Sequence, residues 1–337
     1  CEVVVANYNV EVTKDEVAPQ VASTGALITE EDTIEVGVQF NELLEPDSAE
    51  DAGNYTLKNA NVLSATLADG GDRVLLEVED LDIGGYELTI NGVNDLAGNS
   101  LSGGKVGGDF LGLQVLNIGD IAPEGVAHNF GEEIEVIAGG FDVWSNADDF
   151  TYLFEEKNGD FDMAVQVTEI ENAGGSWARN GLMIRESLED YSKMLGAFVT
   201  PPSGLTNQGY FALERREDSA NCFWWNNNGT PGSPVKHGVI NYGNDAVPGL
   251  PNLWIRMKRS GNKFTAFRSD DGQNWMEMGV NELEFSETVY FGICQSRHAG
   301  TSSFVRYQNY GPFVYQGTEI TITEPPQSVD ATLGWDH

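Results

Sequence analysis

Arginine and tryptophan residues in the middle of the chain are the side chains best suited to contact a ligand. Thirteen of the eighteen Lys and Arg residues lie between Arg179 and Arg306, together with thirteen of the fifty-three Asp and Glu residues. The same part of the chain contains Trp224, Trp225 and, at its edge, Trp177. Aromatic rings can stack on the C–H faces of sugars, and planar polar groups can bind their hydroxyls. We therefore expect saccharide binding in this region.

Two arginines lie in a segment with the pattern of a strand, residues 179–185. A period of two places Arg179 and Arg185 on one face, with Leu182 and Ile184 on the other. Charged groups are almost never fully buried unless they are paired. Each arginine therefore either lines an open face or pairs with an acid. We favour ligand contact for Arg179 and weigh both alternatives for Arg185. The acids considered as partners are Glu186, Glu214 and Asp218.

The Trp224–Trp225 pair precedes a polar loop that begins with three asparagines. Adjacent strand residues point to opposite faces, so we expect one ring in the core and the other exposed. The loop amides would bind hydroxyls. We expect Trp254 and Trp275 to pack between sheets, and Trp144 to fill a core. The candidate ligand-binding residues are Trp177, Arg179, Arg185, Trp224, Trp225, Asn226 and Asn227.

The acidic composition favours cations and disfavours polyanions. The net charge is −35 and the isoelectric point is near 4.1, whereas nucleic acid and anionic lipid require a positive surface. Calcium binds six to eight oxygens and is the one cofactor that we consider. The alternative is that each acidic cluster is a solvated turn. The candidate metal ligands are Asp148, Asp149, Asp160 and Asp162, and a further candidate is the turn from Asp95 to Asn99.

Short β-branched and aromatic runs between Gly, Asn and Asp clusters predict an all-β fold. The clearest element is a hairpin over residues 262–275, with an Asp-Gly turn.

No apolar run approaches the roughly 18 residues of a membrane span, so we expect no membrane insertion. Of the three cysteines, Cys222 and Cys294 either pair or are both small buried residues. Because the chain lacks an initial Met and a signal peptide, we expect a piece of a longer polypeptide.

Four parts follow from these patterns. Residues 1–18 contain a strand from or to a neighbouring module, residues 19–117 form a first sandwich, residues 118–318 a larger one, and residues 319–337 a linker towards a further module. About seven strands in the first sandwich fit an immunoglobulin-like fold. A dozen or more strands in the second suit a two-sheet jelly roll.

Four ordered segments of the first sandwich resemble bacterial immunoglobulin-like modules of S-layer and other surface proteins. They are residues 38–44, 54–57, 86–90 and 94–99. The resemblance implies a spacer that repeats in tandem. An acidic surface would also keep such a spacer from associating with anionic partners and with its own copies.

Six ordered segments of the second sandwich resemble concanavalin A-like domains of secreted bacterial proteins. They are residues 140–144, 148–150, 159–162, 177–185, 254–259 and 269–275. The superfamily includes lectins, carbohydrate-binding modules and glucanases. The glucanase branch would imply a Glu-x-Asp-x-x-Glu strand, and residues 118–318 contain none. None of the four histidines stands in a nucleophile motif, so we expect no enzyme activity.

The sequence predicts a carbohydrate-binding or adhesion segment of a large secreted or cell-surface bacterial protein, with a glycan and neighbouring modules as partners. The alternative is a structural module of a filament, sheath or adhesin that assembles through β-strand contacts without a glycan. In a third hypothesis the chain is an accessory part of a polysaccharide-degrading enzyme.

Overall fold

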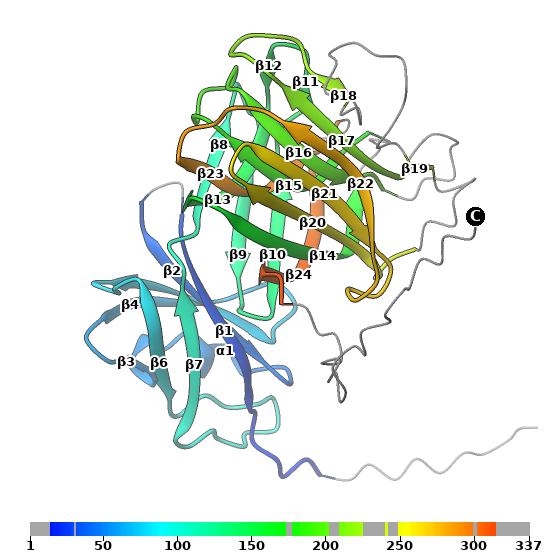
Figure 1. Ribbon diagram of the computed structural model, residues 1–337. Coiled ribbons are helices and arrows are strands. Elements are labelled where there is room, and N and C mark those ends of the chain that lie inside the picture. The colour runs from blue at the N-terminus through cyan, green and yellow to red at the C-terminus, as the bar shows by residue number, and fades with distance from the viewer. Residues whose placement is uncertain are drawn as a thin grey trace, which may run out of the picture.

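The computed structural model describes residues 14–29, 32–172, 177–201, 209–224, 240–241, 249–298 and 302–314. Within them nearly all regular structure is β, which confirms the predicted all-β class; the exceptions are a short helix, α1 (Pro46–Ala49), and a 3-10 turn (Ala52–Asn54). Figure 1 shows the strands in two units, the N-terminal unit below the larger C-terminal one. No helix in the described ranges has the length and apolar character to cross a membrane.

Two facing sheets form the N-terminal unit. One sheet contains β1 (Val21–Ile28), β2 (Ile34–Phe40), β5 (Arg73–Glu79) and β4 (Asn61–Leu67), and the other contains β3 (Tyr55–Leu57), β6 (Gly84–Ile90) and β7 (Gly104–Phe110). The alternating pattern of β2 places Val36, Val38 and Phe40 in one buried cluster with Leu88 and Ile90 of β6. The hydrophobic period thus fixes which face of each strand is inside.

Two larger sheets form the C-terminal unit. The first contains β8 (Gln114–Ile118), β13 (Phe150–Asn158), β23 (Thr288–Ser296), β15 (Arg179–Arg185), β16 (Met194–Val199), β17 (Gly209–Arg215), β18 (Phe223–Trp224) and β19 (Ile240–Asn241). The second contains β9 (Val126–Asn129), β10 (Glu133–Ala138), β24 (Ser303–Pro312), β14 (Phe161–Asn172), β20 (Leu253–Ser260), β21 (Lys263–Ser269) and β22 (Trp275–Glu282). A hairpin of β11 (Val143–Trp144) and β12 (Ala147–Asp148) completes the unit.

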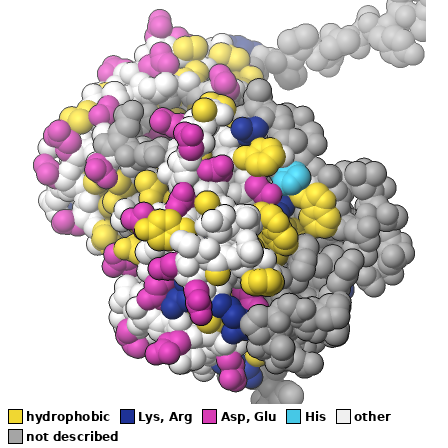
Figure 2. All heavy atoms as spheres, turned by 90° about the horizontal axis from the view of Figure 1, so that it is seen from above, with side chains coloured by type: hydrophobic (Ala, Val, Ile, Leu, Met, Phe, Trp, Pro, Cys, Tyr) yellow, Lys and Arg dark blue, Asp and Glu magenta, His cyan; other side chains and the backbone are white. Residues whose placement is uncertain are grey.

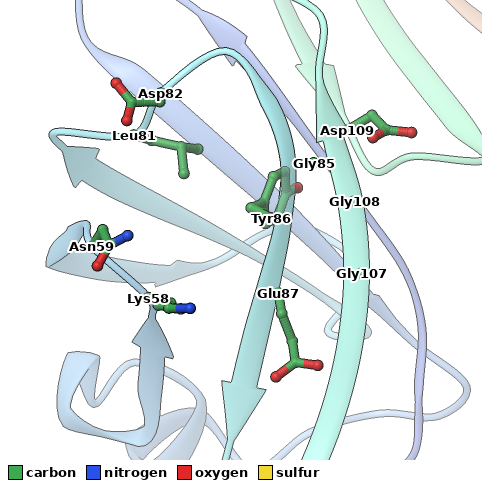
Figure 3. A pocket seen from close by; sticks show the side chains of 10 residues that line it. All are labelled: Lys58, Asn59, Leu81, Asp82, Gly85, Tyr86, Glu87, Gly107, Gly108 and Asp109. Atoms are coloured by element: carbon green, nitrogen blue, oxygen red, sulfur yellow. The ribbon is translucent and has the colours of Figure 1, made fainter.

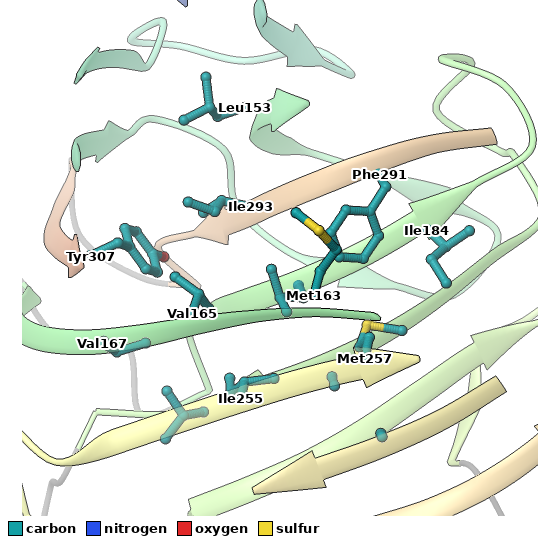
Figure 4. Close-up of a cluster of buried hydrophobic side chains, with 14 of the residues drawn as sticks. Leu153, Met163, Val165, Val167, Ile184, Ile255, Met257, Phe291, Ile293 and Tyr307 are labelled. Carbon is teal, nitrogen blue, oxygen red and sulfur yellow. The ribbon is translucent and has the colours of Figure 1, made fainter. Parts of the chain in front are cut away.

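The main core lies between these two sheets. Figure 4 shows side chains of the second sheet, such as Val165 and Ile255, facing Phe291 and Ile293 of the first. Each buried side chain of this size contributes about 1.5–3 kcal/mol. Ile184 of β15 also lies in this core, whereas Met183 belongs to a separate buried cluster. The predicted division of β15 into two faces is therefore confirmed.

The two units share a sheet. Ile28 of β1 pairs in parallel with Gln114 of β8, and β8 pairs antiparallel with β13. A twelve-stranded sheet therefore runs through both units in the part of the chain that is described. The expected division at residues 117 and 118 falls inside β8. Asn129 of β9 also donates from Nδ2 to the carbonyl of Ala26 at 3.1 Å.

Candidate functional site

Arg185 lies inside the molecule and is bound to an acid. Its Nη1 donates to Asp148 Oδ2 at 2.7 Å, and both side chains are fully buried. Arg215 donates to the same carboxylate from Nη1 and Nη2, at 2.8 and 2.7 Å. The partner of Arg185 is therefore Asp148, instead of Glu186 or the other acids considered from the sequence. In this position Arg185 presents no surface to a glycan.

Arg179 is buried and Trp177 is half-buried, and both contact other side chains. Arg179 is 4% exposed and forms an ion pair with Asp142, with Nη2 and Oδ1 at 2.9 Å. Its guanidinium also lies over the ring of Phe211, 5.3 Å from the centroid. Trp177 is half-buried and meets the same ring edge-on at 6.1 Å. The expected ligand contact of Arg179 is thus replaced by an internal ion pair.

The other expected ligand residues lie at or beyond the described part of the chain. Trp224 is the last residue of β18, and nothing is described of its side chain. Trp225, Asn226 and Asn227 lie outside the described residues.

Cys222 and Cys294 are both free and buried. Burial raises the pKa of Cys222 to about 12, so its thiol is protonated at neutral pH.

The four aspartates expected to bind calcium have other partners. Asp148 is held by two arginines, and Asp162 accepts two hydrogen bonds from Arg256, each of 2.6 Å. Asp149 accepts from the amide of Asp120, and Asp160 from the amide of Gly261. A carboxylate bound by guanidinium has little attraction left for a cation. The four residues are not brought together as one group.

Three other acids do lie together in the N-terminal unit. Asp15, Glu42 and Asp95 each have a carboxylate oxygen within 4.8 Å of the others. Burial and the charges of Asp15 and Asp95 raise the pKa of Glu42. Asp95 accepts hydrogen bonds of 2.8 Å from the amides of Ala97 and Asn99 within its turn. Calcium binding by this chain stays a prediction.

Trp254 lies on the outer face of the second sheet, which corrects its expected position between the sheets. In β20, Leu253, Ile255 and Met257 are buried in the main core, and the alternating residues are not. Trp254 and Arg256 therefore share the outer face. Arg256 and Lys258 alternate with the buried residues in step with Trp254, and these charged residues could have indicated from the sequence that Trp254 faces outward.

The β21–β22 hairpin brings a second tryptophan to the same place, which also corrects its expected core position. The hairpin itself is confirmed, with Ser269 paired to Trp275. In its turn, Asp271 Oδ1 accepts from the amides of Gln273 and Asn274 at 2.8 and 2.7 Å. These bonds hold the pKa of Asp271 well below its usual range. Trp275 Nε1 donates to the carbonyl of Gly272 at 3.0 Å, which fixes its ring on the turn.

Three aromatic rings meet at this place, and the guanidinium of Arg256 lies over two of them, Trp275 and Phe313. The ring centroids of Trp254 and Trp275 lie 6.4 Å apart with planes at 84°, and those of Trp275 and Phe313 lie 5.4 Å apart at 78°. The guanidinium of Arg256 lies 3.7 Å from the Phe313 centroid. Cation–π contact of this kind contributes about 0.5–2 kcal/mol. Arg256 is thereby fixed both by Phe313 and by its carboxylate partner, Asp162.

A cavity of about 470 Å³ opens at these rings, and we call it the aromatic pocket. Its lining combines the three rings with the amide side chains of Gln273 and Asn309. Asn309 donates from Nδ2 to Gln166 Oε1 at 2.8 Å. Aromatic rings together with a few placed polar groups are typical of the lining of a small-ligand site. The described residues that line the pocket are Ala164, Trp254, Asp271, Gly272, Gln273, Trp275, Asn309, Tyr310, Gly311, Pro312, Phe313 and Val314.

A further cavity, of about 650 Å³, lies at the N-terminal unit. Figure 3 shows Tyr86 of β6 pointing into it between Leu81 and the bare backbone of Gly108, with Lys58 and Glu87 nearby. The Tyr86 hydroxyl forms a 3.0 Å hydrogen bond with Thr24 Oγ1. Burial raises the pKa of Tyr86 to about 12. With one ring in its described lining, this cavity offers less stacking surface than the aromatic pocket.

Exposed aromatic side chains also occur near the β11–β12 hairpin. Phe141 is 50% exposed and stacks on His298, with centroids 5.6 Å apart and planes at 15°. Trp144 is 40% exposed, which corrects its expected place in a core. Figure 2 shows hydrophobic side chains beside a histidine on one face of the molecule, with acidic side chains spread around them. Because Trp144 is exposed and does not line the aromatic pocket, it can serve as a control for the tryptophans of that pocket.

Comparisons with protein-family models and with curated protein sequences gave no match. Among solved structures, a functionally unknown protein from Saccharomyces cerevisiae is 14% identical with a TM-score of 0.44, covering 59% of this chain and 94% of that one. The N-terminal part of the bacterial S-layer protein SbsC is 11% identical with a TM-score of 0.26, covering 80% of this chain and 44% of that one.

A longer structure of the same S-layer protein, rSbsC(31-844), is also 11% identical, with a TM-score of 0.28 and coverage of 88% of this chain and 51% of that one. The chain thus spans about half of the SbsC structures. Both SbsC comparisons show a weak structural similarity between this chain and a bacterial surface-layer protein. The immunoglobulin-like and concanavalin A-like assignments stay predictions.

Proposed function

We propose that this chain is a non-catalytic carbohydrate-binding segment of a secreted or cell-surface bacterial protein, and that the aromatic pocket holds the saccharide. The observation that carries the proposal is the meeting of Trp254, Trp275 and Phe313 around a cavity of about 470 Å³ beside two amide side chains. Rings supply area at low conformational cost, and amides both donate to and accept from hydroxyls.

The lining of the pocket supports binding without hydrolysis. Glycoside hydrolysis by the usual route needs two carboxyl groups, one as acid and one as base or nucleophile. Asp271 is the one carboxylate among the described lining residues, and its oxygens accept hydrogen bonds from its own turn. Its lowered pKa keeps it ionised, so it is unsuited to donate a proton.

Affinity electrophoresis in gels that contain a soluble polysaccharide tests this proposal. We expect the chain to be retarded, and we expect Trp254→Ala and Trp275→Ala each to weaken binding about tenfold, the equivalent of about 1.4 kcal/mol. Trp144→Ala, at an exposed tryptophan outside the pocket lining, is the matched control and should bind as the parent does. Equal retardation of all four proteins would refute the assignment of the pocket, and release of reducing sugar would refute the non-catalytic role.

A structural role in a filament, sheath or adhesin is the second candidate function. It is favoured by the sheet that continues from β1 through β8 into β13, because such a sheet joins the two units through strand pairing. Electron microscopy at rising protein concentration tests it. Polymers that form without any saccharide, together with no retardation in the gels, would support this role over glycan binding.

A further inference from the structure

We infer that the aromatic pocket accepts a single, soluble, electrically neutral glycan chain and not the flat face of an insoluble polymer. This inference rests on the proposed function and specifies its ligand class. It follows from two properties of the pocket: the angles between its rings, and the pairing of its charged groups.

The rings form the walls of a corner. A flat polymer face exposes many sugar rings in one plane, so a protein that binds it must present aromatic faces that are close to coplanar. The planes of Trp254 and Trp275 meet at 84°, and those of Trp275 and Phe313 at 78°. No single plane can therefore stack on Trp275 and also on either neighbour. A single chain can enter such a corner and contact rings on two sides of one sugar unit.

Local contacts hold these angles. The Nε1 of Trp275 is bonded to the carbonyl of Gly272, and an added Cβ on Gly272 would come within 2.9 Å of the Trp254 ring. Phe313 packs on the guanidinium of Arg256, which Asp162 holds through two hydrogen bonds. Rotation of the rings into one plane would break these contacts. The corner is therefore present before a ligand binds, which lowers the entropic cost of binding.

The charged groups at the pocket already have partners. The charge of Arg256 is matched by Asp162, and the oxygens of Asp271 accept from Gln273, Asn274 and Ser269. The Tyr310 hydroxyl donates to Glu155 at 3.0 Å. The amides of Gln273 and Asn309 remain as the polar side chains suited to hydroxyls. With a net charge of −35 the whole chain also repels polyanions.

A panel of polysaccharides tests this inference. The soluble neutral probes are hydroxyethyl cellulose, arabinoxylan and galactomannan; the insoluble probes are microcrystalline cellulose and chitin; the anionic probe is polygalacturonate. We expect retardation by at least one soluble neutral probe, no pull-down with the insoluble particles, and no retardation by polygalacturonate. Gln273 is exposed, and within the described structure its side-chain amide forms no hydrogen bond. Gln273→Ala should therefore leave folding intact and weaken binding to the retarding polysaccharide several-fold.

The outcomes separate the inference from the function on which it rests. Pull-down by microcrystalline cellulose or chitin that is lost in Trp254→Ala would keep glycan binding but overturn the single-chain inference. Retardation by polygalacturonate that depends on Trp254 would overturn the neutral-ligand inference. Failure to bind any probe, or binding that neither Trp254→Ala nor Gln273→Ala weakens, would overturn the aromatic pocket as a glycan site and with it the inference.

Discussion

Arg73 of the N-terminal unit donates from Nη2 to Glu133 of the C-terminal unit at 2.5 Å. Its Nη1 is bonded to Glu135, and Arg306 binds both of these acids from the other side. The side chains of Arg73 and Glu133 are 12% and 10% exposed, so solvent screens their attraction only in part. This ion network ties β5 of the shared sheet to β10 of the second sheet, and so adds a further connection between the two units.

Arg73→Ala should loosen the two units from each other. We expect a loss of about 2 kcal/mol in the free energy of unfolding, because the partly buried acids lose a partner. Calorimetry should show one transition for the parent and a separated or broadened transition for the variant. Lys105→Ala removes a pair whose side chains are 60% and 58% exposed, and it should stay within about 0.5 kcal/mol of the parent. Equal effects of the two variants would contradict the coupling role of Arg73.

Asp148→Asn should be among the most damaging single substitutions. Two buried guanidiniums share this carboxylate, and breaking a buried ion pair costs about 3–5 kcal/mol. Urea denaturation followed by fluorescence measures the loss. Asp160→Asn, at an exposed carboxylate that accepts from one backbone amide and one hydroxyl, is the control and should cost about 1 kcal/mol or less. A small effect of Asp148→Asn would show that Arg185 and Arg215 find other acceptors.

His128 should make stability depend on pH. Burial alone would lower its pKa, but the hydrogen bond to Glu35 at 2.9 Å and the charges of Glu35 and Glu135 raise the pKa overall. A raised folded-state pKa gives stability that is fully present below the unfolded value of 6.5 and is lost as the pH rises through the folded value.

Thermal denaturation between about pH 5.5 and pH 8.5 checks this sign. His128→Gln should be less stable than the parent at the acid end, by about 1 kcal/mol, and the two curves should converge at the alkaline end. A difference that grows with pH would contradict the assigned partner. The Glu35→Gln variant should also lose stability at the acid end, because it lacks the carboxylate that favours the charged imidazole of His128.

Gly272→Ala should disturb the aromatic pocket as well as its turn. Gly272 has a φ of +70°, and an added Cβ would also meet the Trp254 ring within 2.9 Å. Gly98 has a φ of +87° with open space around it, so Gly98→Ala introduces backbone strain alone, about 1 kcal/mol. We expect near-ultraviolet circular dichroism to change for Gly272→Ala and to stay unchanged for Gly98→Ala. Identical spectra for both variants would show that the Trp254 ring is not held by Gly272.

The strands were predictable because period-two patterns are local. Met163, Val165 and Val167 alternate in the sequence and lie together in the main core. The pairing of Arg185 with Asp148 was not predictable in this way, since 37 residues separate them and only the fold brings β12 against β15. A sequence pattern gives the two faces of a strand, but it does not give the partner that each face meets.

The aromatic pocket was missed because tryptophan is a large apolar residue and was assigned to the core. Trp254 shares its parity in β20 with Arg256, and a charged residue belongs on the outer face. The turn from Ser269 to Asn274 was recognisable, but the approach of Phe313 was not, because it depends on the end of β24 lying beside β14. Contacts between distant strands carry the part of the site that the sequence does not show.

The parallel pairing of Ile28 with Gln114 also has a mechanical consequence. A pull on the chain ahead of β1 would load the backbone hydrogen bonds that join β1 to β2, and through β8 the strain would pass into β13. The ion pair between Arg73 and Glu133 lies at the same junction, so the two units would move together. A saccharide bound at Trp254 and Trp275 would then be loaded through these strand contacts and this ion pair.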